Sequence, residues 1–163
     1  MKMYVLQVRS GYENSVCNEL EKQGFDAVLP VRQEFIRRGG KWNICEKIIF
    51  TQYVFIRSEI TEEDYYKIKK IAGIVRFLGY ENGVLQPLNH AEQCYIEWLW
   101  NDGKPVEPSK IYVTPSGDKM IFSGILRKYS GDEIEYNLHQ RKADIFIKIS
   151  GRKHRITLPV IRI

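Results

Sequence analysis

The stretch "NLHQRKADIFIKISGRKHRI", from Asn137 to Ile156, contains alternating isoleucines between two clusters of basic residues. Alternate residues of a β-strand lie on the same face of its sheet. Ile145, Ile147 and Ile149 are therefore predicted to share a buried face, while Lys148 points outward. Because the two basic clusters flank this strand, they are predicted to lie near turns or on outward faces.

The same period of two continues through the last third of the chain. Ile134, Tyr136 and Leu138 are predicted to share one face, and turns are predicted at Pro115-Ser116-Gly117 and Gly131-Asp132. Several short strands with almost no helix, within roughly fifty residues, favour a small closed barrel, since closure removes exposed sheet edges.

Positive charge is concentrated in this region. Residues 109–163 contain 11 Lys and Arg against 5 Asp and Glu, whereas residues 1–108 contain 14 against 15. Such asymmetry indicates a module that binds a polyanion, joined to a nearly neutral one, because Lys and Arg release condensed counterions when they meet phosphates. A solvated basic surface without a partner is the alternative.

The order of predicted elements before the basic region indicates an α+β fold. The segment "NDGKPVEPSK", residues 101–110, combines Gly103 with Pro105 and Pro108 and is predicted to be a linker. Upstream, the patterns predict a strand at 4–9, a helix at 13–23, a hairpin turning at Gly39-Gly40, and helices starting near Thr61 and Asn89. These elements fit helices packed on a mostly antiparallel sheet.

The composition favours a protein of a reducing cytoplasm. The chain has 163 residues and three cysteines, Cys17, Cys45 and Cys94, without a C-x-x-C pair. No N-terminal apolar segment is typical of a secretion signal or membrane span. We expect a cytoplasmic protein, a monomer, with no membrane association.

Six short segments in order and spacing resemble the N-terminal domain of the NusG family of transcription elongation factors: "YVLQVRSGYE", "VLPVRQEF", the hairpin arginines, "FTQYVFI", "IVRFLG" and "QPLNHAE". "GDKMIFSGIL" and "NLHQRKADIFIKISGR" resemble the C-terminal KOW barrel of that family. The basic barrel is most similar to LoaP, a specialised paralogue whose relatives act as antiterminators. The resemblance implies an NGN-type domain at 1–100, a linker at 101–110 and an SH3-like KOW barrel at 111–163.

Two positions depart from the family pattern. Members usually carry Phe-Pro-Gly-Tyr where this chain has "FTQY", residues 50–53, so a differently built turn is expected. Housekeeping members place a phenylalanine, used in contacts with Rho or a ribosomal protein, where this chain has Ser150. The serine removes an apolar anchor and argues against the housekeeping role.

The resemblance also implies candidate binding residues. Tyr53 and Phe55 match aromatics that receive the clamp helices of the largest RNA polymerase subunit, although burial of both in the core is the alternative. Arg37, Arg38 and Lys41 at the hairpin tip are candidates for contact with upstream or non-template DNA, or a solubilising turn. The barrel residues expected to bind a nascent RNA hairpin are Arg127, Lys128, His139, Arg141, Lys142, Arg152, Lys153 and Arg155.

Catalytic chemistry has little support in the sequence. His90 and Cys94 are spaced to share a helix face with Glu92 between them, but no further Cys or His pair completes a zinc site. No Gly-rich phosphate loop or G-x-S-x-G motif is present. His139 and His154 are interpreted as nucleic-acid contacts or surface groups, His154 being equally compatible with a half-buried place at the rim.

The sequence therefore predicts a non-enzymatic elongation and antitermination factor without a cofactor or metal. Its N-terminal domain would bind RNA polymerase, and its basic barrel would bind a nascent RNA hairpin. Two alternatives remain open at this point: a general NusG protein coupled to Rho or the ribosome, and a ribosome-associated RNA-binding KOW protein.

Overall fold

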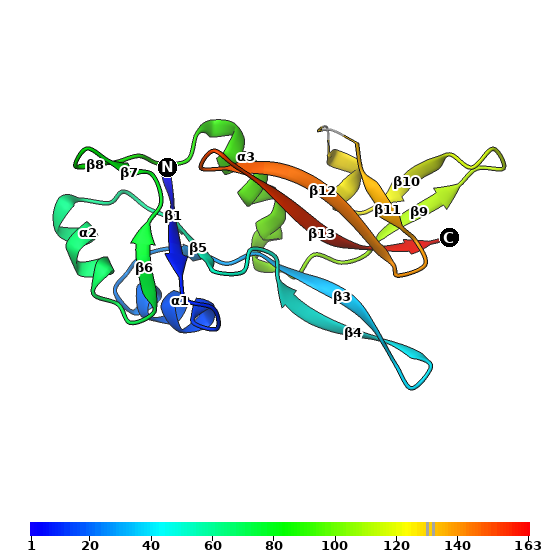
Figure 1. The fold of residues 1–163 in the computed structure, drawn as a ribbon, viewed down its shortest axis with the longest axis horizontal. Helices are drawn as coiled ribbons and strands as arrows, with labels where there is room; N and C mark the ends of the chain where they lie inside the picture. The colour runs from blue at the N-terminus through cyan, green and yellow to red at the C-terminus, as the bar shows by residue number, and fades with distance from the viewer. Residues whose placement is uncertain (130, 132) are drawn as a thin grey trace. The chain divides into compact units, whose positions relative to one another are not determined.

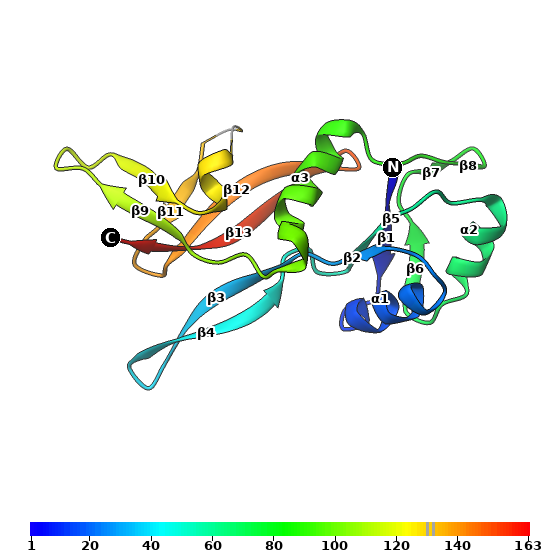
Figure 2. The same ribbon diagram turned by 180° about the vertical axis from the view of Figure 1, so that it is seen from behind.

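The computed structural model describes residues 1–129, 131 and 133–163, and its ribbon is seen from opposite sides in Figures 1 and 2. The chain forms two compact units. The first comprises residues 1–29, 50–96 and 149–151, and the second comprises residues 30–49, 97–148 and 152–163.

The first unit is built on a four-stranded antiparallel sheet with the order β2-β5-β1-β6. Its strands are β1 (Met3–Val8), β2 (Ala27–Val28), β5 (Tyr53–Arg57) and β6 (Ile74–Phe77). Helix α1 (Glu13–Lys22) contacts β2 and β5, and α2 (Glu62–Lys69) contacts β6. Side chains on both faces of β1 are buried, which makes this strand the centre of the core.

Helix starts in this unit follow the predicted capping residues. Thr61 and Asp64 form a capping box at α2, in which each side chain accepts the other residue's backbone N–H at 3.1 Å. Asn89 and Glu92 make the same reciprocal pair before α3 (His90–Trp100), at 3.1 and 2.8 Å. Both predicted starts are confirmed, because side-chain acceptors satisfy N–H groups that have no partner inside the helix.

A small hairpin precedes α3, formed by β7 (Tyr80–Glu81) and β8 (Val84–Leu85). The division between the units falls within α3, between Ile96 and Glu97.

The second unit contains the predicted Gly-Gly hairpin and a five-stranded sheet. Strands β3 (Val31–Arg38) and β4 (Lys41–Ile48) pair over their whole length and are joined by Gly39 and Gly40, both with positive φ. The sheet has the order β10-β9-β13-β12-β11, with β13 parallel to β9. Its strands are β9 (Ser109–Val113), β10 (Lys119–Ser123), β11 (Glu135–Asn137), β12 (Lys142–Ile149) and β13 (Arg152–Arg162).

The alternation predicted for the barrel is confirmed on β12. Ile145, Ile147 and Ile149 are buried, and Lys148 is exposed. A short 3₁₀ helix, η2 (Ile125–Lys128), follows β10. Its Leu126 has an exposed fraction of 0% and belongs to the core. The mixed α+β architecture expected from the sequence is thus confirmed. The turn expected at Gly131-Asp132 includes Asp132, which lies outside the described residues.

The segment 101–110 is more ordered than predicted. It begins as a 3₁₀ turn, η1 (Asn101–Gly103), and its last two residues already belong to β9. Between them Val106 is buried and pairs with β3, donating to Val31 and accepting from Gln33, both at 2.8 Å. A single apolar residue between Pro105 and Pro108 thus pairs with a strand that is distant in sequence.

Candidate nucleic-acid interface

Strand pairing in the β3–β4 hairpin places a half-buried aromatic residue beside a cation. Because the turn is Gly39-Gly40, Arg37 lies opposite Trp42. The Arg37 guanidinium carbon lies 5.7 Å from the centre of the Trp42 ring, within the distance at which a cation is attracted to a ring face. Phe35 supports this ring from the same hairpin, edge to face at 6.2 Å.

Arg141 of the barrel joins this hairpin. Its guanidinium carbon lies 4.6 Å from the Trp42 ring centre and 4.9 Å from that of Phe35. The residue has a φ of +58°, and its carbonyl accepts a hydrogen bond from the Val160 N–H at 3.1 Å. We call Phe35, Arg37, Trp42 and Arg141 the tryptophan cluster. It presents two guanidinium groups around one half-buried indole.

A cavity of about 310 Å³ adjoins the tryptophan cluster. Its lining residues are Phe35, Arg37, Trp42, His139, Gln140 and Lys142. The lining combines aromatic rings, cationic groups and an amide, which is the set of groups that stacks on bases and contacts phosphates in single-stranded nucleic acids. None of the described lining residues forms a nucleophile paired with a base.

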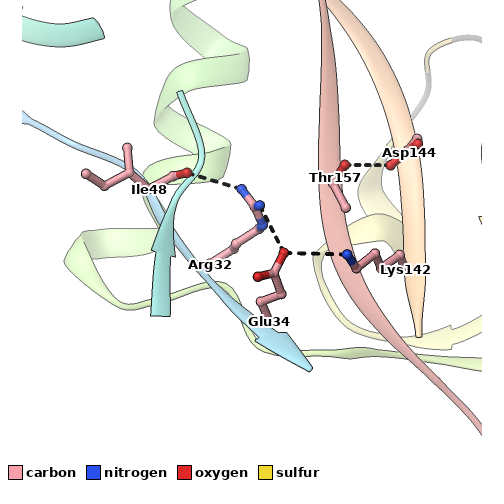
Figure 3. A network of polar contacts seen from close by, with 6 residues as sticks. All are labelled: Arg32, Glu34, Ile48, Lys142, Asp144 and Thr157. Atoms are coloured by element: carbon pink, nitrogen blue, oxygen red, sulfur yellow. Dashed lines mark hydrogen bonds and ion pairs between the residues drawn. The ribbon is translucent and has the colours of Figure 1, made fainter. Parts of the chain in front are cut away.

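One carboxylate moderates the positive charge of the cavity. Glu34 accepts a hydrogen bond from Arg32 at 3.3 Å and lies 3.8 Å from the Lys142 ammonium group (Figure 3). Arg32 also donates to the Ile48 carbonyl at 3.2 Å, which fixes its guanidinium against β4. Lys142 is therefore held in place and partly neutralised, whereas no acidic partner of Arg141 or His139 is found among the described residues.

The remaining predicted RNA-binding residues form two further groups. Lys153 and Arg155 lie over the Phe146 ring at 4.7 and 5.1 Å, with Arg152 exposed at the start of β13. Arg127 and Lys128 lie exposed on η2. The structure thus brings His139, Arg141 and Lys142 together with the hairpin.

Arg155 is the most strongly neutralised of the predicted RNA contacts. Its guanidinium donates to Asp144 at 2.7 Å and lies 3.4 Å from a Glu135 carboxylate oxygen. Asp144 also accepts the Thr157 hydroxyl at 2.7 Å (Figure 3). These contacts place Arg155 in a network between strands, so fewer of its N–H groups remain to meet phosphate.

His154 is half-buried on β13. Burial lowers the pKa of His154, and the nearby Arg152 charge lowers it further. Both effects favour the neutral form of the ring.

At the hairpin tip, the three predicted DNA contacts separate. Arg37 belongs to the tryptophan cluster, while Arg38 and Lys41 pair across the turn and are exposed. In the first unit, Phe55 is 0% exposed and packs edge to face on Phe50 at 5.3 Å, whereas Tyr53 is half-buried. Only Tyr53 of this pair therefore offers surface to a partner.

The turn that departs from the family pattern is built around Gln52. This residue has a φ of +69°, its N–H donates to Glu13 at 3.0 Å, and its carbonyl accepts from Val8 at 2.8 Å. The other unusual residue, Ser150, is exposed in the turn 149–151, and its N–H donates to Glu92 at 2.6 Å.

Sequence reasoning missed Trp42 and Phe35. A signal was available, because counting outward from a Gly-Gly turn places Arg37 opposite Trp42. Their contact with Arg141 had no local signal, since Arg141 is far away in the chain.

The structure offers little to hold a metal ion. His90 Nε2 lies 3.5 Å from Cys94 Sγ, but no cluster of three or more His, Cys, Asp or Glu occurs within residues 1–129, 131 and 133–163. Within the same ranges, no helix has the length and apolar character needed to cross a membrane.

The fold and the candidate interface define a two-unit α+β protein with a basic, aromatic surface. The family described as "Transcription termination factor nusG" matches residues 1–95. The chain belongs to the NusG family.

Similarity extends over nearly the whole chain. The chain is 31% identical to a transcription termination/antitermination protein NusG of Staphylococcus carnosus, and the alignment covers 93% of this chain and 88% of that protein. The protein of the same name from Bacillus subtilis is 23% identical, and the alignment covers 98% of this chain and 96% of that protein. A solved structure titled "Domain interaction in Thermotoga maritima NusG" superposes with a TM-score of 0.60 at 23% identity, covering 97% of this chain and 93% of that one.

Proposed function

We propose that this protein is a transcription elongation and antitermination factor of the LoaP type. The segment 1–100 binds RNA polymerase, with Tyr53 at the contact, and the basic barrel 111–163 binds a nascent RNA hairpin. Membership of the NusG family supports the polymerase partner. The exposed Ser150 supports a specialised role, because it offers no apolar anchor for the housekeeping partners.

The observation that carries the RNA proposal is the cavity beside the tryptophan cluster. Lys142 and Arg37 supply positive charge at its wall, and Trp42 with Arg141 supplies flat surfaces for a base. A generic cationic surface would bind any nucleic acid with a salt-dependent affinity alone. A site that also stacks a base distinguishes a looped or bulged RNA from a plain duplex.

The hairpin tip extends the same proposal to DNA. Arg38 and Lys41 are exposed at the turn and have no apolar neighbour across it, so they are free to approach upstream or non-template DNA in an elongation complex. Reversing both charges is expected to weaken binding to a nucleic-acid scaffold with polymerase, while binding to free polymerase stays the same.

The test compares Arg141→Lys with wild type in a titration of the full chain against a looped RNA hairpin and a scrambled strand. Lysine keeps the charge but loses the planar group that stacks on Trp42. We expect hairpin affinity to fall about tenfold and the preference over the scrambled strand to narrow. The matched control is Arg76→Lys on β6, whose guanidinium donates to Gln7, and it should leave both affinities unchanged.

Salt dependence separates charge from stacking in the same titration. If about five phosphates are engaged, log affinity should fall against log salt with a slope near −4, and Arg141→Lys should keep this slope. Equal affinities of wild type for hairpin and scrambled strand would leave only a basic surface. Co-purification with ribosomal subunits in place of polymerase would favour the ribosome-associated alternative.

A further inference from the structure

One face of the β9–β10–β13 part of the barrel sheet exposes apolar side chains across three strands. Tyr112 of β9 pairs with Met120 of β10, and their exposed fractions are 46% and 58%. Phe122 is 62% exposed and lies at a register shift between Ile121 and Ser123. The bulge thus adds an extra aromatic residue to the outward side of an edge strand.

The third strand continues this surface. Ile161 of β13 pairs with Lys110 of β9, and Ile163, 55% exposed, donates its N–H to the Ile111 carbonyl at 2.9 Å beside Tyr112. We call the whole surface the β9–β10 face. Its members are Lys110, Tyr112, Met120, Phe122, Ile161 and Ile163. Large apolar groups clustered on an exposed surface are typical of an interaction site, unlike single scattered ones.

The charge on these strands selects the chemistry of the partner. β9, β10 and β13 contain no Asp or Glu, whereas Lys110 supplies a cation within the face. Arg127 adds a guanidinium group that donates to the Phe122 carbonyl at 3.5 Å. An anionic partner is therefore complementary, and a basic one is not.

Two exposed aromatic rings on neighbouring strands, with cations beside them, match the requirements of unpaired nucleotides. Bases stack on flat rings without regard to sequence, and the phosphates between them meet Lys and Arg. A base-paired helix cannot use such rings, because its bases are already stacked. We propose that the β9–β10 face binds single-stranded RNA through stacking on Tyr112 and Phe122.

This face lies outside the tryptophan cluster, whose residues it does not share, so it is a second RNA contact beyond the proposed hairpin site. The two sites make different demands: the cavity takes the loop bases and phosphates of a structured hairpin, and the β9–β10 face takes a continuous unpaired strand. RNA binding by this face does not depend on a role in antitermination. The two sites are measured with separate RNA probes, one unpaired and one a hairpin.

The experiment titrates the full chain with a uridine oligonucleotide of about ten nucleotides and with a blunt RNA hairpin that has no tails. Tyr112→Ala and Phe122→Ala are each expected to lower affinity for the oligonucleotide about tenfold, as for loss of one stacked base. Hairpin affinity should stay within about twofold, because no base of the blunt hairpin needs the face. Phe122→Trp should retain oligonucleotide binding, since its ring stacks as well or better.

Tyr66→Ala is the matched control, because Tyr66 is 54% exposed on α2 in the other unit. It should change neither affinity. Thermal unfolding of each variant verifies that it is folded, and the exposed positions make loss of folding unexpected.

Three results would overturn the inference. The first is unchanged oligonucleotide affinity in the Tyr112→Ala, Phe122→Ala double variant. The second is that a polyglutamate peptide with interspersed leucines binds as tightly as the oligonucleotide and is lost in the same variant, which would assign the face to an acidic protein. The third is dimerisation of wild type by sedimentation that the double variant abolishes without loss of oligonucleotide binding. If the wild-type protein does not bind the hairpin at all, the proposed function is overturned, but the inference about the β9–β10 face is unaffected.

Discussion

Glu13 shows how one residue allows the family turn to be replaced. Its side chain is 4% exposed and accepts the N–H groups of Gly11 at 2.8 Å and Gln52 at 3.0 Å. Burial by itself raises the pKa of Glu13, but the hydrogen bonds from Gln52, Glu13 and Gly11 outweigh it, and the pKa is lowered. A buried carboxylate thus joins the start of α1 to the turn before β5.

Glu13→Gln is expected to lower the free energy of unfolding at pH 7 by about 1 to 3 kcal/mol, because a neutral amide accepts these bonds more weakly and brings donors that have no partner. A lowered folded pKa stabilises the protein above the unfolded pKa, and this part is lost as pH falls through the folded value. Denaturant unfolding at pH 7 and near pH 3 measures both effects. The exposed Glu21→Gln is the control, and an equal loss at both pH values would contradict the assignment.

Cysteine reactivity gives a second prediction at this scale. Burial, with smaller contributions from Glu21 and Glu13, raises the pKa of Cys17 to about 12, whereas Cys94 is exposed. Because the thiolate is the reactive form, an alkylating reagent at pH 8 should label Cys94 rapidly and Cys17 only after denaturant is added. Mass spectrometry of digested protein distinguishes the sites. Rapid labelling of Cys17 in the native protein would show that α1 opens readily.

At the scale of elements, the sequence predicted local features well and contacts between distant segments poorly. The Gly39-Gly40 turn and both helix starts were predicted correctly because they depend on neighbours in the chain. The approach of Arg141 to Trp42, and of Lys142 to Glu34, could not be found, because a period of two says which face a residue lies on but not which strand faces it. The bulge at Phe122 was not predicted for a related reason, because a register shift between paired strands has no signal in the composition of either strand.

Glu34→Gln tests how the contact between Glu34 of β3 and Lys142 of β12 affects the positive charge of the cavity. Removing this charge leaves Arg32, whose side chain is 15% exposed, without its ionic partner, and we expect a loss of about 1 kcal/mol in the free energy of unfolding. It also releases Lys142 from a carboxylate 3.8 Å away, so hairpin RNA affinity should rise about threefold. Titration and denaturant unfolding measure the two effects, with exposed Glu46→Gln on β4 as the control. A fall in RNA affinity would indicate that Glu34 positions Lys142 for binding.

At the scale of the whole molecule, the two units carry separate parts of the proposed function. Tyr53 and Phe55 lie in the first unit, while the tryptophan cluster and the β9–β10 face lie in the second. Each function should therefore be removable without the other. One residue predicted from the sequence does not divide in this way. Arg37 was predicted to contact DNA with Arg38 and Lys41, but it lies in the tryptophan cluster.

The burial of Phe55 decides how the polymerase contact can be tested. Phe55→Ala would empty a site that is 0% exposed and should lower the free energy of unfolding by about 3 to 5 kcal/mol, so its effect on binding would not be specific. Tyr53 is half-buried, so Tyr53→Ala should affect stability far less. If its ring anchors the clamp helices, polymerase affinity should fall by about 2 kcal/mol, or roughly thirtyfold.

The measurement is binding of the full chain to RNA polymerase, alongside thermal unfolding and hairpin RNA titration of the same variant. Tyr53→Phe is the matched variant, because it keeps the ring and should retain most of the affinity. Hairpin affinity should not change, since Tyr53 and the tryptophan cluster belong to different units. If Tyr53→Ala binds polymerase as tightly as wild type, the aromatic contact lies elsewhere on the first unit, and the exposed Tyr66 and Tyr80 beside α2 become the next residues to replace.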